Sequence, residues 1–161
     1  MNGKEQLSKD LRAVDIFTGL ASHELEQIAE VCSLRTYQDG ERCAVQGEKI
    51  DELRIVREGK VAIEIRIQVA PSPQTLRIAI LTAGNAFAYC SVTEPHIVFA
   101  SGKCLGQAQI ISIKASDLQR IFKERPSIER VVMKNMATVM ASRLRDNLTQ
   151  LMRLVAEMMP K

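Results

Sequence analysis

A chain of 161 residues has the length of one domain with a proper core, or of one domain followed by a long helix. The apolar fraction of 46% and the charged fraction of 25% are ordinary for a globular protein, and a net charge of +3 is too small to indicate nucleic-acid binding by itself. No signal peptide is visible in the polar N-terminus, and the apolar runs are far too short to span a bilayer. We therefore expect a cytoplasmic protein without a membrane segment.

The first part of the chain is predicted to be helical. Apolar side chains recur at steps of three and four between residues 5 and 32, which is the period of an amphipathic helix. The segment 15–19 breaks this pattern into two pieces, and Ser22 is in position to cap the second piece.

The middle of the chain changes to the period of a β-strand. Residues 60–69 alternate strictly between apolar and polar side chains, and residues 76–80 repeat the pattern after a turn that contains two prolines. Shorter candidates lie at 34–37, 41–45, 52–56, 98–104 and 108–113, and glycine turns separate them. Many short strands at even spacing predict an eight-stranded antiparallel β-roll or jelly roll, so the fold class is mainly β with flanking helices.

Helix returns after residue 113. Ser116 and Gln119 have the spacing of a capping box, which predicts a helix that stops near Pro126. Residues 127–159 then contain no glycine or proline, which predicts one long helix. An apolar set near its start is expected to pack on the roll: Val132, Met136, Val139 and Met140.

A second apolar stripe follows this helix at alternating steps of four and three, which is the heptad seam of a coiled coil. We predict a parallel homodimer through this seam, with small residues at the near end that let two helices approach closely. The alternative is a helix that folds back on its own roll. The predicted dimer interface is Ala137, Ala141, Leu144, Leu148, Leu151, Val155 and Met158.

The order of these elements resembles the cyclic-nucleotide-binding domain family, the sensor module of catabolite-activator-type regulators, kinase regulatory subunits and some ion channels. The resemblance rests on the segments 15–20, 37–41, 46–48, 53–61 and 109–113, and above all on Gly40, Gly47 and Gly59 at the spacing of the family's turns. It implies a helical segment at residues 1–14, a β-roll domain at 15–125 and a dimerisation helix at 126–161.

The family resemblance also implies a ligand site. A cyclic phosphate would lie on backbone N–H groups at a short helix after a Gly-Glu pair, and an Arg one short loop later would pair its charge. In this chain Phe87 matches, but Ala88 stands in the place of the Gly, Tyr89 in that of the Glu and Val98 in that of the Arg. We therefore expect the fold without the usual cyclic-nucleotide affinity.

Some ligand capacity could remain in this phosphate-binding cassette, the stretch 84–91 followed by 98–100. The segment of Ser91 could still open a short helix, and His96 could partly replace the Arg if the following strand extends back to it. The pocket is either filled by its own side chains or open to an apolar or planar ligand. The candidate ligand-binding residues are Gly84, Phe87, Ala88, Tyr89, Cys90, Ser91, His96, Val98, Phe99 and Ala100.

Metal chemistry has little support in the sequence. The four cysteines form no C-x-x-C pair and no histidine lies at zinc-finger spacing, so we expect reduced, packed thiols and no metal or cofactor. The alternative is a haem or metal held by Cys90 and His96, because a thiolate and an imidazole are competent iron ligands.

The predicted function is a stand-alone regulatory sensor module in which binding of cyclic AMP or cyclic GMP is weak or lost. The alternative is a dimeric pseudo-receptor, an interaction scaffold with no small-molecule ligand. An enzyme is disfavoured, because two histidines cannot form a metal cluster and no catalytic triad is readable. A helix-turn-helix has no room after the long helix, so we expect a signal through a small-molecule effector, a protein partner or self-association, and no DNA binding.

Overall fold

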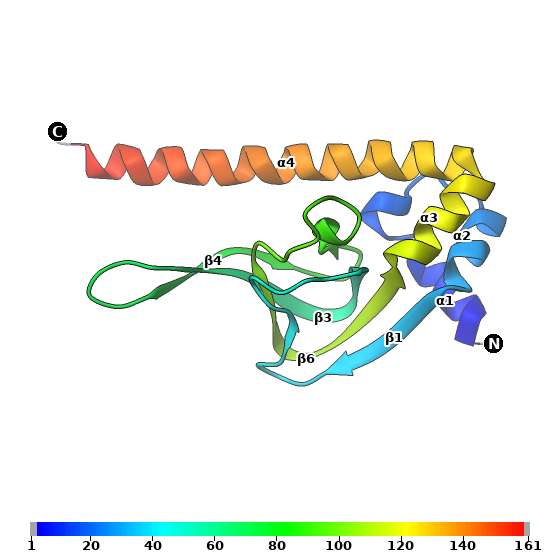
Figure 1. Ribbon diagram of the computed structural model, residues 1–161, viewed down its shortest axis with the longest axis horizontal. Coiled ribbons are helices and arrows are strands. Elements are labelled where there is room, and N and C mark those ends of the chain that lie inside the picture. The colour runs from blue at the N-terminus through cyan, green and yellow to red at the C-terminus, as the bar shows by residue number, and fades with distance from the viewer. Residues whose placement is uncertain (1–2, 160–161) are drawn as a thin grey trace.

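The computed structural model describes residues 3–159. The helices lie at the two ends of the chain: α1 (Gly3–Leu11), the 3-10 helix η1 (Asp15–Phe17) and α2 (Ser22–Ala29) come first, and α3 (Ala115–Glu124) and α4 (Pro126–Met158) come last. The strands between them are β1 (Cys32–Tyr37), β2 (Arg42–Ala44), β3 (Glu52–Ile67), β4 (Gln74–Leu81), β5 (Ala86–Phe87) and β6 (Ser101–Lys114), and a second 3-10 helix, η2 (Tyr89–Ser91), follows β5. Figure 1 shows α4 running along one side of the rolled sheet.

The strands of the described chain form one antiparallel sheet. Its order is β1-β6-β3-β4, with β2 on β6 and β5 on β3. The two longest strands, β3 and β6, pair over almost their whole length, from Glu52 opposite Lys114 to Glu64 opposite Ser101. This antiparallel roll between N-terminal helices and a long C-terminal helix confirms the predicted fold class.

Residues 3–159 form six strands, and not the predicted eight. The predicted strands 52–56 and 60–69 are one strand, β3, and the predicted strands 98–104 and 108–113 are one strand, β6. The β3–β6 register shifts on either side of Glu58, and Gly59 there has φ of +84°. A Cβ atom on Gly59 would lie 2.5 Å from the Gln107 carbonyl oxygen. The glycine therefore bends a continuous strand against its neighbour instead of ending it.

Two of the predicted helix starts are wrong, by one residue for α2 and by two residues for α3. Helix α2 begins at Ser22 itself, and the carboxylate of Glu24 accepts the Ala21 N–H at 2.8 Å, so Glu24 takes the capping role expected of Ser22. Helix α3 begins at Ala115, before Ser116, because β6 runs directly into it. The Ala115 N–H donates to a carbonyl of the loop before β3 at 2.8 Å, which replaces a side-chain cap.

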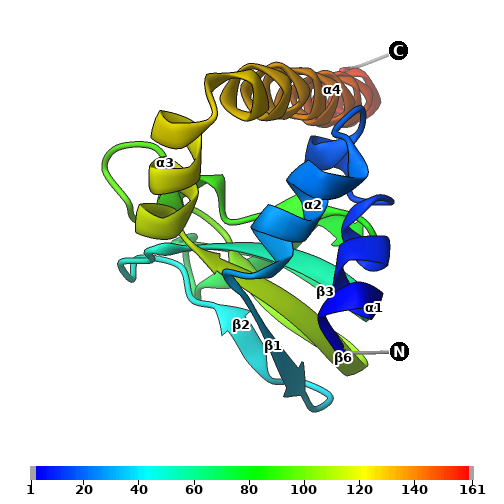
Figure 2. The same ribbon diagram turned by 90° about the vertical axis from the view of Figure 1, so that its right-hand side faces the viewer.

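The core has two parts that meet across the sheet. In one, the N-terminal helices, α3 and the start of α4 pack on one face of the sheet, with Leu11, Phe17 and Ile128 at most 1% exposed. The other fills the inside of the roll and includes Val61 and Cys104, both fully buried. Figure 2 shows α2, α3 and the beginning of α4 together at the same end of the roll. The long helix is thus anchored firmly at its N-terminal end.

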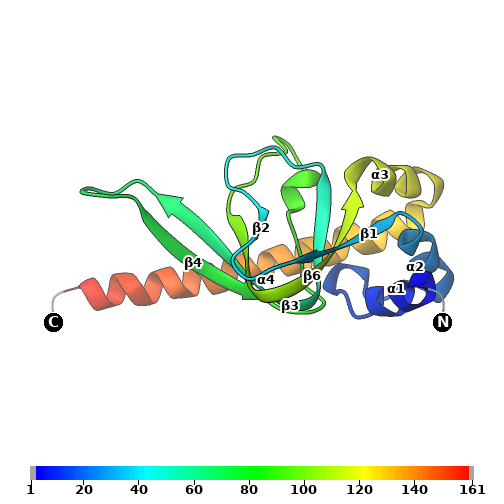
Figure 3. The ribbon, with the colours of Figure 1, turned by 90° about the horizontal axis from the view of Figure 1, so that it is seen from below.

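The rest of α4 leaves the core. Val132 and Met136 are buried as predicted, and Val139 packs against the same cluster. Beyond that point the predicted seam is exposed, from 44% at Val155 to 76% at Met158. Figure 3 shows this part of α4 extending past the roll in the same direction as the β3–β4 hairpin. None of the described helices is both long and apolar enough to cross a lipid bilayer.

Candidate functional site

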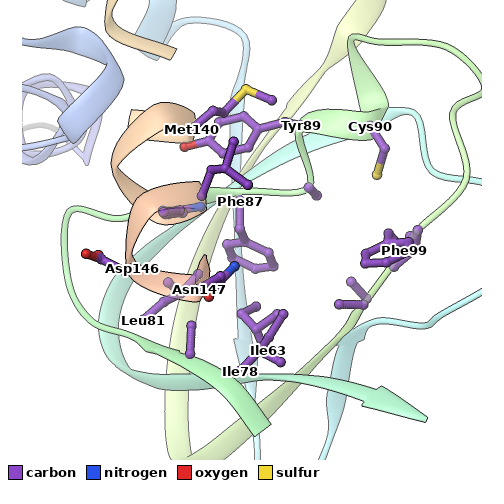
Figure 4. Close-up of a pocket in the computed structure, with 17 residues that line it drawn as sticks. Ile63, Ile78, Leu81, Phe87, Tyr89, Cys90, Phe99, Met140, Asp146 and Asn147 are labelled. Carbon is purple, nitrogen blue, oxygen red and sulfur yellow. The ribbon is translucent and has the colours of Figure 1, made fainter. Parts of the chain in front are cut away.

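A cavity of about 530 Å³ lies between α4 and the open side of the roll. The connection between β4 and β6, which contains β5 and η2, forms one wall, and α4 covers the cavity (Figure 4). The sheet contributes Ala44, Ile63, Ile78, Ala79 and Leu81. With this volume and a mainly apolar lining, the cavity has the size and character of a small-molecule site.

Part of the predicted site lies together at this cavity. The residues of the predicted set that line it are Phe87, Ala88, Tyr89, Cys90, Val98, Phe99 and Ala100. Gly84, Ser91 and His96 are not among the lining residues.

Gly84 is a turn residue that positions the cassette from outside. Its φ is +89°, its N–H donates to the Val56 carbonyl at 2.9 Å, and its carbonyl accepts the Asp15 N–H at 2.9 Å. A Cβ atom here would lie 2.7 Å from the Ala13 carbonyl oxygen. Only glycine fits this close approach between the turn and the N-terminal helices.

His96 lies in the loop after η2, and the strand that would have to extend back to it for it to replace the Arg does not do so. Strand β6 begins only at Ser101, and His96 has φ of +61° in the loop before it. Its Nδ1 atom donates to the carbonyl oxygens of Cys90 and Ser91, both at 3.1 Å. These bonds hold the ring against the loop backbone and away from the cavity lining.

The structure gives the Cys90–His96 pair no shared metal geometry. The imidazole contacts the Cys90 carbonyl and not its thiol, and burial raises the pKa of that thiol. Within residues 3–159, no group of three or more His, Cys, Asp and Glu side chains could hold a metal ion. The four cysteines are free, and burial raises the pKa of Cys43 to about 12.

The positions of the missing Glu and Arg are apolar in character. Val98 is 4% exposed, and its backbone pairs with Glu48 and Gly47. Tyr89 packs against the helical core cluster, and its Oη is buried with no hydrogen-bond partner in the described part of the chain. Burial also raises the pKa of Tyr89, so the phenol is neutral. Neither residue offers the charge that a cyclic phosphate or a ribose hydroxyl would need.

Ala88 holds a backbone conformation suited to glycine. Its φ of 61° and ψ of 40° lie in the left-handed region, immediately before η2. A side chain with a Cβ costs about 1–2 kcal/mol there. The turn that starts the cassette is therefore retained although its glycine is not.

We expect Ala88→Gly to stabilise the protein by about 0.5–1 kcal/mol, because relief of the left-handed strain exceeds the added entropy of the unfolded chain. Urea unfolding followed by circular dichroism measures the change. Ala62→Gly is the matched control at a buried strand position, and it should destabilise by about 1 kcal/mol. Equal losses of stability in the two variants would contradict the strained conformation at Ala88.

Sequence reasoning missed the part of the site that α4 supplies. The helix residues that line the cavity are Met140, Arg143, Leu144, Asp146 and Asn147. A signal for them exists in the sequence, because Arg143 lies four residues after Val139 and seven after Met136. It therefore continues the helix face that was predicted to pack on the roll.

Arg143 connects three parts of the site. Its Nη2 donates to the Ala86 carbonyl oxygen at 2.7 Å and lies 3.6 Å from Asp15 Oδ2. Its guanidinium lies over the Tyr89 ring, 5.3 Å from the centroid. Burial raises the pKa of Asp15, while the Ala86 N–H and Arg143 act in the opposite direction. The cavity wall thus carries one cation held by η1, β5 and η2.

The comparisons with known proteins agree with this architecture. Residues 34–125 match the family model of the cyclic nucleotide-binding domain. The chain is 30% identical over 138 residues to glutaminase 1 of Bradyrhizobium diazoefficiens. That match covers 84% of this chain but only 21% of the glutaminase.

Two solved structures extend the likeness. The catabolite activator protein of Thermus thermophilus is 26% identical, with a TM-score of 0.70 over 88% of this chain and 63% of that one. A cyclic nucleotide-binding domain from Methylobacillus flagellatus KT has a TM-score of 0.79 over 98% of this chain and 85% of that one, but its 14% identity shows the fold alone. The family match over residues 34–125, on an antiparallel roll closed by a long helix, shows that the chain belongs to the cyclic nucleotide-binding domain family.

Proposed function

We propose that this chain is a regulatory sensor module whose pocket takes an apolar or planar small molecule in place of a cyclic nucleotide. The observation that carries the proposal is the cavity of about 530 Å³ at the cassette, with Tyr89 and Val98 at the positions of the missing charges. The cavity remains open although both replacements are apolar in character. This favours a changed ligand over a pocket filled by its own side chains.

The lining supports binding and not catalysis. Besides Arg143 and Asp146, its polar side chains are those of Tyr89, Cys90 and Asn147. The Tyr89 phenol and the Cys90 thiol both have raised pKa values because of burial, so neither is poised as a nucleophile or base. The resemblance to part of a glutaminase does not supply a reaction at this pocket, and we propose no enzymatic activity.

The output of the module is proposed to pass through α4. The same helix covers the cavity with Met140, Arg143 and Leu144, and then continues as the exposed seam. A ligand that alters the contacts of α4 with the roll would therefore alter the presentation of the seam. A contiguous exposed apolar stripe of this kind is typical of an interaction surface, and we propose a parallel homodimer as its use.

The proposal is tested with the fluorescent, uncharged aromatic N-phenyl-1-naphthylamine. We expect saturable binding to the wild-type protein, and Ala79→Trp should weaken it at least about tenfold because the indole would occupy the cavity. Ala21→Phe, an exposed position at the start of α2, is the control that adds a similar aromatic group elsewhere and should leave binding unchanged. If Ala79→Trp leaves the affinity for N-phenyl-1-naphthylamine unchanged, or if the wild-type protein does not bind it, the pseudo-receptor scaffold without a ligand is favoured.

A further inference from the structure

Arg143 has unused hydrogen-bonding capacity at the cavity. A guanidinium carries five N–H donors in a fixed fork. The structure shows one hydrogen bond from this side chain, to the Ala86 carbonyl, and its contact with Asp15 at 3.6 Å is a long ion pair. An anionic group of a ligand could therefore accept two parallel N–H bonds from Arg143 and would have only a long ion pair to Asp15 to displace.

The other charged group of the lining does not oppose this role. Asp146 is the only carboxylate among the lining residues, and Figure 4 shows its oxygens directed away from the aromatic rings of the cavity. The same view places the Asn147 amide toward Phe87. The polar side of the cavity, formed by α4, therefore presents a cation and a neutral amide.

The opposite side of the cavity is apolar and partly aromatic. Phe87, Phe99 and Ile63 come from the sheet and the cassette, and Figure 4 shows them across from α4. Phe99 is 77% exposed, so its ring stands at the mouth of the cavity. A flat hydrophobic body fits between such side chains, with its anionic end toward α4.

We propose that the ligand is a planar apolar molecule with one carboxylate-like anionic group, and that Arg143 is its counter-ion. This inference rests on the proposed function and specifies the ligand class of the same pocket. It places the cation of the pocket on the long helix, at a different position from the Val98 site where the family resemblance expects an Arg.

The same contacts make Arg143 a link between ligand and helix. In the absence of a ligand, Asp15 of η1 competes for the guanidinium, and Asp15 Oδ1 also accepts the Ala86 N–H at 3.2 Å. A bound anion would draw Arg143 from Asp15 and loosen the connection between α4 and η1. Because the two anions compete, removal of the Asp15 charge should tighten ligand binding.

The test measures displacement of N-phenyl-1-naphthylamine by 2-naphthoate and by 2-naphthalenemethanol, which share the same rings and differ in charge. We expect the wild-type protein to bind 2-naphthoate about tenfold to hundredfold more tightly than 2-naphthalenemethanol. This is the range that a charge-assisted hydrogen bond gives, at about tenfold in Kd per 1.4 kcal/mol.

Three variants assign the preference to the proposed residues. Arg143→Met should bring the ratio of the two affinities, 2-naphthoate over 2-naphthalenemethanol, near one. It should still bind N-phenyl-1-naphthylamine, which shows that the pocket is intact. Arg143→Lys should retain part of the preference, because an ammonium supplies the charge without the fork. Asp15→Asn should raise the ratio severalfold, and its amide oxygen can still accept the Ala86 N–H.

The outcomes separate this inference from the proposed function. Equal binding of the two naphthalenes to wild-type protein, or a ratio unchanged in Arg143→Met, overturns the role of Arg143 and leaves the apolar pocket standing. If Arg143→Met does not fold, an unchanged ratio in Asp15→Asn overturns it instead. Failure of the wild-type protein to bind any of the three aromatics overturns both proposals.

Discussion

Leu148→Lys is expected to convert a homodimer into a monomer. Leu148 is 49% exposed at the middle of the predicted seam and is not among the residues that line the cavity. Helix α4 has 33 residues, which gives a length of about 50 Å, so the roll cannot cover all of it. A lysine at the centre of a two-helix seam would bury a charge without a partner, which costs several kcal/mol. Sedimentation at tens of micromolar protein measures the change.

The matched control for this prediction is Gln150→Lys, which adds the same charge two residues further along the helix and off the seam. It should leave the dimer intact. Both variants should retain the unfolding transition of the roll, because the anchored residues Ile128, Val132 and Met136 lie far from either site. A wild-type protein that already sediments as a monomer, or a Leu148→Lys variant that remains dimeric, would show that the seam serves another purpose.

The sequence predicts those elements whose pattern continues over many neighbouring residues. The alternation over residues 60–69 and the absence of glycine and proline over 127–159 are signals that span several turns or strand residues, and both elements are present as β3 and α4. Strand β5 has two residues and η2 has three, which is too short for any period to be read. The cassette residues that line the pocket were predicted through the resemblance to the family, which implies a ligand site in this short part of the chain.

The missing information about the site concerns contacts between distant segments. The contact of Arg143 with Asp15 joins α4 to η1, and no local pattern encodes it. Similarly, Glu58 and Gly59 read as a turn, but the pairing of β3 with β6 on both sides makes them a bulge in a continuous strand. The predicted strand 98–104 starts at Ser101 instead, because the residues before it are held by loop contacts such as those of His96. Tertiary packing decides these cases over local propensity.

Loss of cyclic-nucleotide affinity is the second large effect that we expect. An Arg at the position of Val98 would pair the cyclic phosphate, and removal of one partner of a buried charge pair costs about 3–5 kcal/mol. At about tenfold per 1.4 kcal/mol, this weakens a micromolar site to a Kd between about 0.1 mM and a few millimolar. Tyr89 adds to the loss, because its oxygen is buried and a neutral phenol accepts a hydrogen bond from a ribose hydroxyl more weakly than a carboxylate does. Arg143 supplies one positive charge to the cavity from α4, but it stands at neither of the two cassette positions, Tyr89 and Val98.

Titration calorimetry with cyclic AMP and cyclic GMP tests the central claim most directly, namely that this pocket has lost the chemistry of its family. We predict no saturation at tens of micromolar nucleotide for the wild-type protein, in line with the charge-pair cost of about 3–5 kcal/mol. A low-micromolar Kd for either nucleotide would contradict the account. Abolition of that binding in Arg143→Met would then show that the helix supplies the charge missing at Val98.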